Sequence, residues 1–483
     1  MVGCDNIELP HDQSADAFAV PCHEKKMTYR RMYHLLLAVS LLEIPLQFDA
    51  YFFYREEDAQ FGALAGLNVS VMTFCLIGLY ILRQIEPRQS REALAFTRRH
   101  VGVPLLLYLG TVAFSVVTAE QSMLAVFDLA MLLQGYLLYL FLANWIRSVS
   151  DVQFVMRVLT WSLAMQSTLV VATRVLGPGS VMERFRTAIG EDMRVSGTVG
   201  SPVTTGSFLA LLLVPVATQL LTERSRRRKV WIFAVVTLAT LGLLFTQTRG
   251  ALLAAMIGMS VVGWYTWRRG WLPRTAVIGT LIVALVAIVP LSIVVKSRVA
   301  EGDDGSAVAR LHHSRIALRV IADHPWIGVG SGNCHVVGQR YANQSPFRSE
   351  WYYTVHNKYL LVWVETGIVG MGAFVAYLAS TIWSGWRGWQ VRHRQLSPLA
   401  LALAGSILGQ SVHMAVDIFN QRPNSQMLMC IAGVTVGVAT AARCARHVAA
   451  GNNAAGNNAA GNNAGRRRVA MNQHLPAGAA HVC

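Results

Sequence analysis

Apolar stretches recur along the chain and are separated by short polar segments. Each stretch is about 18 to 23 residues long, so as an α-helix it can cross a bilayer core roughly 30 Å thick. The pattern predicts an all-α integral membrane protein with about twelve transmembrane helices. These helices are expected at residues 33–53, 62–82, 101–118, 122–145, 154–175, 203–222, 229–247, 251–267, 275–295, 361–383, 397–416 and 425–442. The long polar interval at 296–360 predicts one large loop between the ninth and tenth helices.

Composition supports a membrane protein and narrows its partners. Hydrophobic residues make up 53% of the chain and charged residues 14%, with a mean hydropathy of +0.40. A soluble domain of this size rarely tolerates that balance. The formal net charge of +16 is explained by basic cytoplasmic loops and anionic lipid headgroups. We therefore expect membrane lipids as partners and no nucleic acid.

Lysine and arginine in the loops predict which way the bundle faces. Basic residues concentrate in alternate loops, such as 83–99, 224–229 and 268–274, and the positive-inside rule places these loops in the cytoplasm. Both termini are then cytoplasmic, and the large loop faces the other side of the membrane. No cleaved signal peptide is expected, because a mostly polar segment precedes the first apolar span.

The same pattern divides the chain into three regions. Residues 1–31 are expected to form a cytoplasmic N-terminal segment, and residues 32–445 the polytopic membrane domain, with its large loop at 296–360. Residues 446–483 repeat Gly-Asn-Asn-Ala and offer nothing to bury, so they are expected to be a disordered cytoplasmic tail.

His356 stands where the large polar loop meets the tenth apolar span. An imidazole at a water-membrane boundary can exchange a proton near neutral pH. Asn357 and Tyr359 add hydrogen-bonding groups, and Glu365 follows at a helical spacing. A capping or packing role is the alternative for this histidine, but its neighbours favour a catalytic site in which Asn357 and Tyr359 contact the substrate.

Arginines also concentrate on the outward-facing side, against the usual bias. They lie in a glycine-punctuated turn before the sixth span, between the seventh and eighth spans, and on a stretch of the large loop with amphipathic helical periodicity. The residues are Arg194, Arg249, Arg310, Arg315 and Arg319. Guanidinium groups stay charged and bind phosphate oxygens through paired hydrogen bonds, so we predict a phosphate-binding site. Anchoring at the membrane interface is the alternative.

Metal and nucleotide sites are not expected. His312, His313, His324, His335 and His356 share the large loop, but they lack the paired spacing of a zinc motif, and no cysteine pair assists them. The glycine-rich residues 326–333 resemble a nucleotide-binding loop only superficially, because no strand precedes them. We therefore predict no metal and no cofactor.

The order of these motifs resembles the O-antigen ligase and polymerase superfamily of bacterial inner-membrane glycosyltransferases. The resemblance rests on the segments 194–198, 248–251, Arg310 with 317–318, 324–330, and 356–357 through 365–370. It covers roughly residues 30 to 445 in topology. The aromatic residue that usually stands four positions after Arg310 is Ser314 here, which weakens the local match without touching Arg310.

The resemblance implies a GT-C-like membrane enzyme and a particular reaction. A ligase of this superfamily joins an O-antigen glycan, carried on undecaprenyl diphosphate, to the lipid A–core oligosaccharide during lipopolysaccharide biosynthesis. The active site then faces the periplasm from the inner membrane.

A mechanism follows from the residues and the resemblance together. Arg249 and Arg310, helped by Arg194, would hold the diphosphate and take the electrostatic role of a metal ion. His356 would accept the proton of the attacking hydroxyl. Direct displacement would invert the anomeric centre. Arg315 and Arg319 would contact phosphates of the acceptor.

Other functions remain open at this point. An O-antigen polymerase, or a ligase that delivers glycan to a protein, would use the same chemistry. A transporter or flippase is a different class, for which twelve helices is a common count. Asp128 and Arg157 are the clearest buried charges, no internal repeat is evident, and the polar residues gather outside the membrane. These features favour the transferase.

Overall fold

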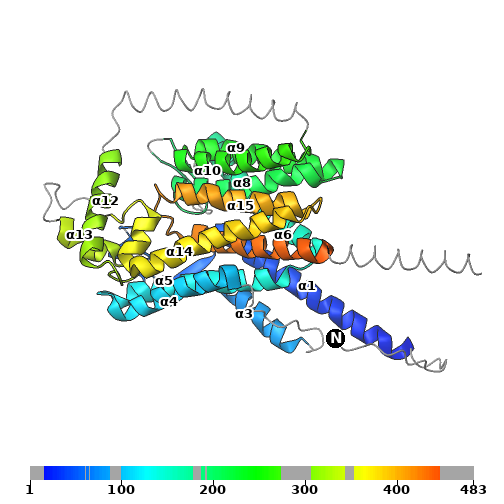
Figure 1. Ribbon diagram of the computed structural model, residues 1–483, viewed down its shortest axis with the longest axis horizontal. Coiled ribbons are helices and arrows are strands. Elements are labelled where there is room, and N and C mark those ends of the chain that lie inside the picture. The colour runs from blue at the N-terminus through cyan, green and yellow to red at the C-terminus, as the bar shows by residue number, and fades with distance from the viewer. Residues whose placement is uncertain are drawn as a thin grey trace, which may run out of the picture.

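The fold is that of a computed structural model, which describes residues 16–59, 61–64, 66–86, 99–177, 187–190, 193–272, 306–342 and 353–446. Long helices lie roughly side by side in one bundle, and two shorter helices cover one end (Figure 1). The predicted ninth span at 275–295 and the tail beyond residue 446 lie outside the described residues. The start of α1 and the end of the last helix both lie at the end of the bundle away from the short helices.

The long helices follow the apolar stretches closely. They are α1 (Asp16–Leu46), α3 (Val71–Ile85), α4 (Arg99–Thr118), α5 (Ser122–Trp145), α6 (Val149–Leu176), α8 (Pro202–Thr222), α9 (Arg226–Phe245), α10 (Arg249–Arg268), α14 (Lys358–Gln390), α15 (Leu396–His413) and a final helix, Arg422–Arg446. Within the described residues, nine of the helices are long and apolar enough to cross a membrane. The chain is therefore a multi-pass membrane protein of the all-α class.

The first two predicted spans have different bounds in the structure. Residues 49–52 form strand β1 (Asp49–Phe52), which pairs antiparallel with β2 (Leu67–Ser70), and the short helix α2 (Glu56–Ala59) lies between them. Predicted helix bounds of 33–53 and 62–82 are wrong at these ends. The reason is a tertiary ion pair: fully buried Arg422 lies 3.1 Å from Glu43 and 3.2 Å from Asp49, which fixes the end of α1 and the start of the hairpin.

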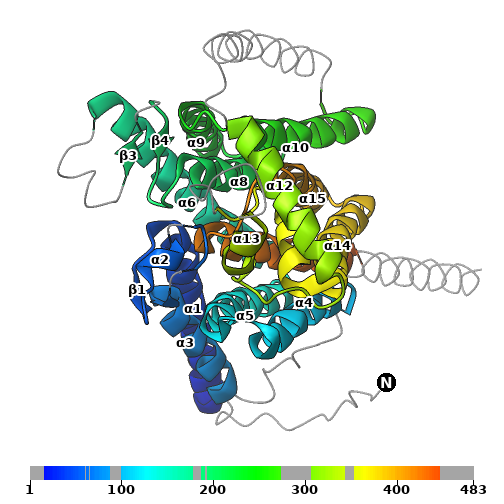
Figure 2. The same cartoon turned by 90° about the vertical axis from the view of Figure 1, so that its left-hand side faces the viewer.

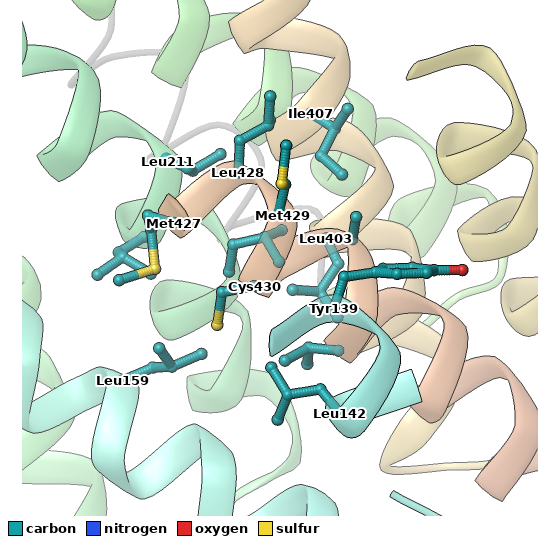
Figure 3. Packing of buried hydrophobic residues seen from close by; sticks show 14 of the residues in the cluster. Tyr139, Leu142, Leu159, Leu211, Leu403, Ile407, Met427, Leu428, Met429 and Cys430 are labelled. Atoms are coloured by element: carbon teal, nitrogen blue, oxygen red, sulfur yellow. The ribbon is translucent and has the colours of Figure 1, made fainter. Parts of the chain in front are cut away.

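The final helix forms the centre of the bundle. Figure 3 shows Met427, Leu428, Met429 and Cys430 among side chains from α5, α6, α8 and α15. Apolar residues surround this helix on every side, so its length is buried against protein. Such packing explains why it carries almost no polar face.

Helices α10 and α15 approach each other with unusually little side-chain bulk between them. A Cβ atom at Gly258 would lie 3.1 Å from the backbone oxygen of Gly405, and one at Gly409 would overlap the backbone of Ala254. Small residues allow this backbone contact between membrane helices. The contact brings the first residues of α10 next to the last residues of α15.

Two helices of the large loop cover one end of the bundle. Helix α12 (Ser306–Asp323) crosses this end, and α13 (Cys334–Ala342) lies beside it (Figure 2). Ala317, Val320 and Ile321 of α12 are buried, whereas Leu311 and Leu318 are exposed. A helix is therefore present where the sequence predicted one, but only part of its predicted apolar face is buried.

Helix α14 is interrupted at Gly367, whose φ of 69° is left-handed. The segment Pro325–Asn333 fills the interruption: Val329 N–H donates to the carbonyl of Val364 over 2.8 Å, and Gly330 N–H donates to that of Glu365 over 2.9 Å. Only glycine fits at 367, because a Cβ atom there would lie 2.6 Å from the backbone nitrogen of Ile327. The glycine-rich segment that resembled a nucleotide loop thus completes a broken helix.

Candidate active site

The turn that carries His356 is fixed by hydrogen bonds on its C-terminal side. Asn357 is the N-cap of α14, and its side-chain oxygen accepts from the N–H groups of Tyr359 and Leu360 over 3.0 and 3.1 Å. The hydroxyl of Tyr359 donates to the carbonyl of Ser411 in α15 over 2.6 Å. These hydrogen bonds give Asn357 and Tyr359 a role in placing His356 at the end of the bundle.

The imidazole of His356 is half-buried between two other rings. Its centroid lies 5.2 Å from that of Tyr353 and 5.9 Å from that of His313, and both rings stack on it. Burial, followed by the charges of Arg310 and His313, lowers the pKa of His356 to about 4. The backbone of Thr354 opposes this shift. His356 is therefore neutral at physiological pH and able to accept a proton.

The positive charge of Arg310 acts on several titratable groups around it. Its exposed side chain lies on α12 within electrostatic reach of His356, of His413 at the end of α15, and of Asp417 beyond it. Burial raises the pKa of Asp417 to about 6. A hydrogen bond from the backbone N–H of Ile418 and the positive charges of Arg310 and Lys358 oppose this rise. The histidine and arginine predicted from the sequence therefore lie near each other in the structure.

Arg194 and Arg249 meet at one turn. The guanidinium of Arg194 donates to the carbonyl of Thr246 over 3.1 Å and to the hydroxyl of Thr248 over 3.4 Å. Arg249 follows directly as the first residue of α10, with an exposed side chain. Gln247 has a left-handed φ of 50°, a strained conformation that the neighbouring bonds stabilise.

His413 connects this arginine turn to Arg310. A Cβ atom at Gly250 would lie 2.7 Å from Nε2 of His413, so the ring packs directly on the start of α10. Nδ1 of His413 lies 3.2 Å from the hydroxyl of Ser207 and 3.2 Å from Nε2 of Gln410. Through His413 the structure joins two groups of predicted residues, one at Arg194 and Arg249 and one at Arg310 and His356.

Arg315 and Arg319 lie farther along α12 and are exposed. Burial, followed by the charges of these two arginines, lowers the pKa of His312. Ser314, which replaces the usual aromatic residue, donates its hydroxyl to the carbonyl of Arg310 over 2.9 Å. The structure therefore places Arg315 and Arg319 beside His312.

Sequence reasoning missed His413, Asp417 and Lys358, and misjudged one charge. Arg157 is exposed, so the prediction that it is buried is wrong, whereas Asp128 is buried as expected. A histidine and an aspartate at the end of an apolar span were the available signal for His413 and Asp417. Within the described ranges, no group of three or more histidine, cysteine, aspartate or glutamate side chains could hold a metal ion.

The fold and site together define a polytopic membrane protein with a cationic, histidine-containing site at one end of the helix bundle. Residues 233–375, from α9 into α14, match the family model described as O-antigen ligase. The match includes Arg249, Arg310 and His356. This part of the chain is similar to the O-antigen ligase family, and the match supports the superfamily of membrane glycosyltransferases that contains O-antigen ligases and polymerases.

The other comparisons add little. No curated protein matches the chain. Among solved structures, the chain is similar to one from the work "Structural coordination of polymerization and crosslinking by a peptidoglycan synthase complex". The two are 18% identical, the similarity covers 71% of this chain and 97% of the other, and the TM-score is 0.37.

Proposed function

We propose that the protein is an O-antigen ligase that transfers a glycan from undecaprenyl diphosphate to the lipid A–core oligosaccharide. The observation that carries this proposal is the half-buried imidazole of His356, which stacks on His313 of α12 and lies within reach of the Arg310 charge. A base of this kind beside fixed cations suits transfer from a diphosphate, because one group takes a proton while the others stabilise the negative charge of the leaving group. The match of residues 233–375 to the O-antigen ligase family model supports the choice of substrates.

In the proposed reaction, His356 accepts the proton of the acceptor hydroxyl as its oxygen attacks the anomeric carbon. The bond between that carbon and the diphosphate oxygen breaks, and the electron pair leaves with undecaprenyl diphosphate. Arg249 and Arg310 stabilise the charge on the departing phosphate, and Arg194 holds the turn of Arg249 while contributing its own charge. Attack opposite the leaving group inverts the anomeric centre, with no metal ion required.

The orientation belongs to the same proposal. We place the protein in the bacterial inner membrane with both termini in the cytoplasm and the His356 end facing the periplasm. Support comes from the basic segment Arg224–Lys229, which joins α8 to the first turn of α9, at the opposite end of α9 from the start of α10 at Arg249. Arg315 and Arg319, exposed on α12, would then be available for phosphates of the acceptor.

A reconstituted assay with purified undecaprenyl-diphosphate glycan and purified lipid A–core tests the proposal. His356→Ala and Arg249→Ala should each remove transfer, whereas His324→Ala and Arg224→Ala, which change exposed residues away from the turn, should retain it. Transfer at the rate of the unmodified protein by His356→Ala would refute the mechanism. Elongation of the donor glycan with no product on lipid A–core would instead identify a polymerase.

A further inference from the structure

A cluster of buried charges lies directly behind the His356 turn. Lys358, Glu365 and Asp128 are 6%, 4% and 2% exposed, and they line a cavity of about 20 Å³, which has room for about one water molecule. The hydroxyl of Ser331 donates to Asp128 over 2.7 Å, and the N–H of Gly332 donates to Glu365 over 3.0 Å. Charges in such surroundings are costly unless opposed, so the lysine and the carboxylates stabilise one another.

Lys358 bonds to the segment Met414–Asn420, whose Phe419 and Asn420 line the same cavity. Its ammonium donates to the side-chain oxygen of Asn420 over 3.1 Å, and its backbone N–H donates to the carbonyl of Met414 over 2.8 Å. The segment carries Asp417, on which the charge of Lys358 acts. Phe419 in the same segment has a left-handed φ of 50°, a conformation that requires support from its neighbours.

Lys358, two positions after His356, therefore interacts with two parts of the fold. The carboxylates of α5 and α14 act on it through their charge, and the segment that follows α15 is joined to it by hydrogen bonds. Resting on the function proposed above, we propose that Lys358 is a positioning residue for glycan transfer, which fixes the His356 turn and the Met414–Asn420 segment as one unit. The imidazole, Arg310 and Asp417 then keep their relative places during the reaction.

The alternative role for Lys358 is only to balance the buried negative charge, and this role predicts a different result. Such a residue could be removed together with one carboxylate at no cost to the reaction. Glu365→Gln and the double variant Lys358→Met/Glu365→Gln form the matched pair, since they differ only at Lys358. Relative to the unmodified protein, the double variant loses one positive and one negative formal charge, so the net formal charge of the three-residue cluster is unchanged.

Two measurements on purified full-length protein compare this pair. The first is the transfer rate as a function of pH and of donor concentration. We expect the double variant to lose about tenfold or more in kcat, with KM for the donor nearly unchanged, because the reacting groups are misplaced and not lost. The acidic limb of its pH profile should move to higher pH, since Asp417 loses a neighbouring cation and its pKa rises further.

The second measurement is hydrogen–deuterium exchange, which is independent of activity. Peptides that cover residues 353–358 and 414–421 should exchange faster in the double variant than in Glu365→Gln, while peptides from α8 should not change. Asn420→Leu removes the same hydrogen bond without altering charge, and it should reproduce both effects even if the double variant fails to fold. Its effect combined with the loss of Lys358 should be less than additive.

The outcomes separate the two proposals. Equal kcat, equal pH profiles and equal exchange in the matched pair would overturn the role of Lys358. If the unmodified protein transfers no glycan to lipid A–core, the proposed function fails, and the exchange of residues 353–358 and 414–421 still decides whether Lys358 joins the two segments.

Discussion

Gly250 offers a sharp test of how the arginine turn is joined to His413. In Gly250→Ala the new methyl group would lie 2.7 Å from Nε2 of His413, closer than carbon and nitrogen approach in folded proteins. The ring cannot easily move away, because Ser207 and Gln410 hold its other nitrogen. Overpacking of this kind costs about 1–3 kcal/mol, and a displacement of about 1 Å at a reacting group costs on the order of 100-fold in rate.

Gly263→Ala in the same helix is the matched control. No atom lies within 4 Å of the position where its Cβ would stand. Alanine in place of glycine restricts the unfolded chain at either position, so the difference between the two variants reports mainly the clash with His413. Thermal unfolding in detergent and the initial rate of glycan transfer measure the two effects. Gly250→Ala with the stability and rate of Gly263→Ala would refute the close packing of α10 on His413.

Three further predictions follow from the charges. The transfer rate should decline as pH falls through about 6, where Asp417 gains a proton. Asp417→Asn should remove this decline and leave the lower decline near pH 4, where His356 gains a proton. Arg310→Gln should raise the pKa of His356, because a cation that disfavours the imidazolium is lost. The acidic decline of the residual transfer rate should therefore move to higher pH, and an unchanged pH profile would contradict the proximity of the two groups. Arg422→Ala should cost about 3–5 kcal/mol of stability by leaving buried Glu43 unpaired, and unaltered thermal unfolding would show that this ion pair is dispensable.

The sequence predicts those parts of the fold that depend on local pattern. The predicted bounds of α5, α6, α8 and α15 agree with the observed ones to within a few residues. A continuous hydrophobic length marks such a helix in the sequence, whether it is buried in the bilayer or in the bundle. The apolar period over residues 311–321 similarly predicted a helix in the large loop, although Leu311 and Leu318 are exposed. Both signals are present within the segment that folds.

Features that depend on distant partners could not be predicted in this way. The end of α1 is set by Arg422, which is far away in the sequence, and the interruption of α14 is filled by the segment Pro325–Asn333. His356 and Arg310 could be selected as candidates because each stands in a distinctive local motif. His413 and Lys358 could not, since their importance arises from contacts with Gly250 and Asn420.

The interruption at Gly367 has a mechanical consequence. Beyond it, α14 runs on through the bundle, whereas its first turns are bonded to the segment that follows α12. Those turns are therefore bonded to the segment between α12 and α13 as well as to α15 and the residues that follow it, although they continue the long helix in chain order. A substrate that displaced α12 would also displace His356, because His313 of α12 stacks on its ring. The part of α14 beyond Gly367 would not have to move with them.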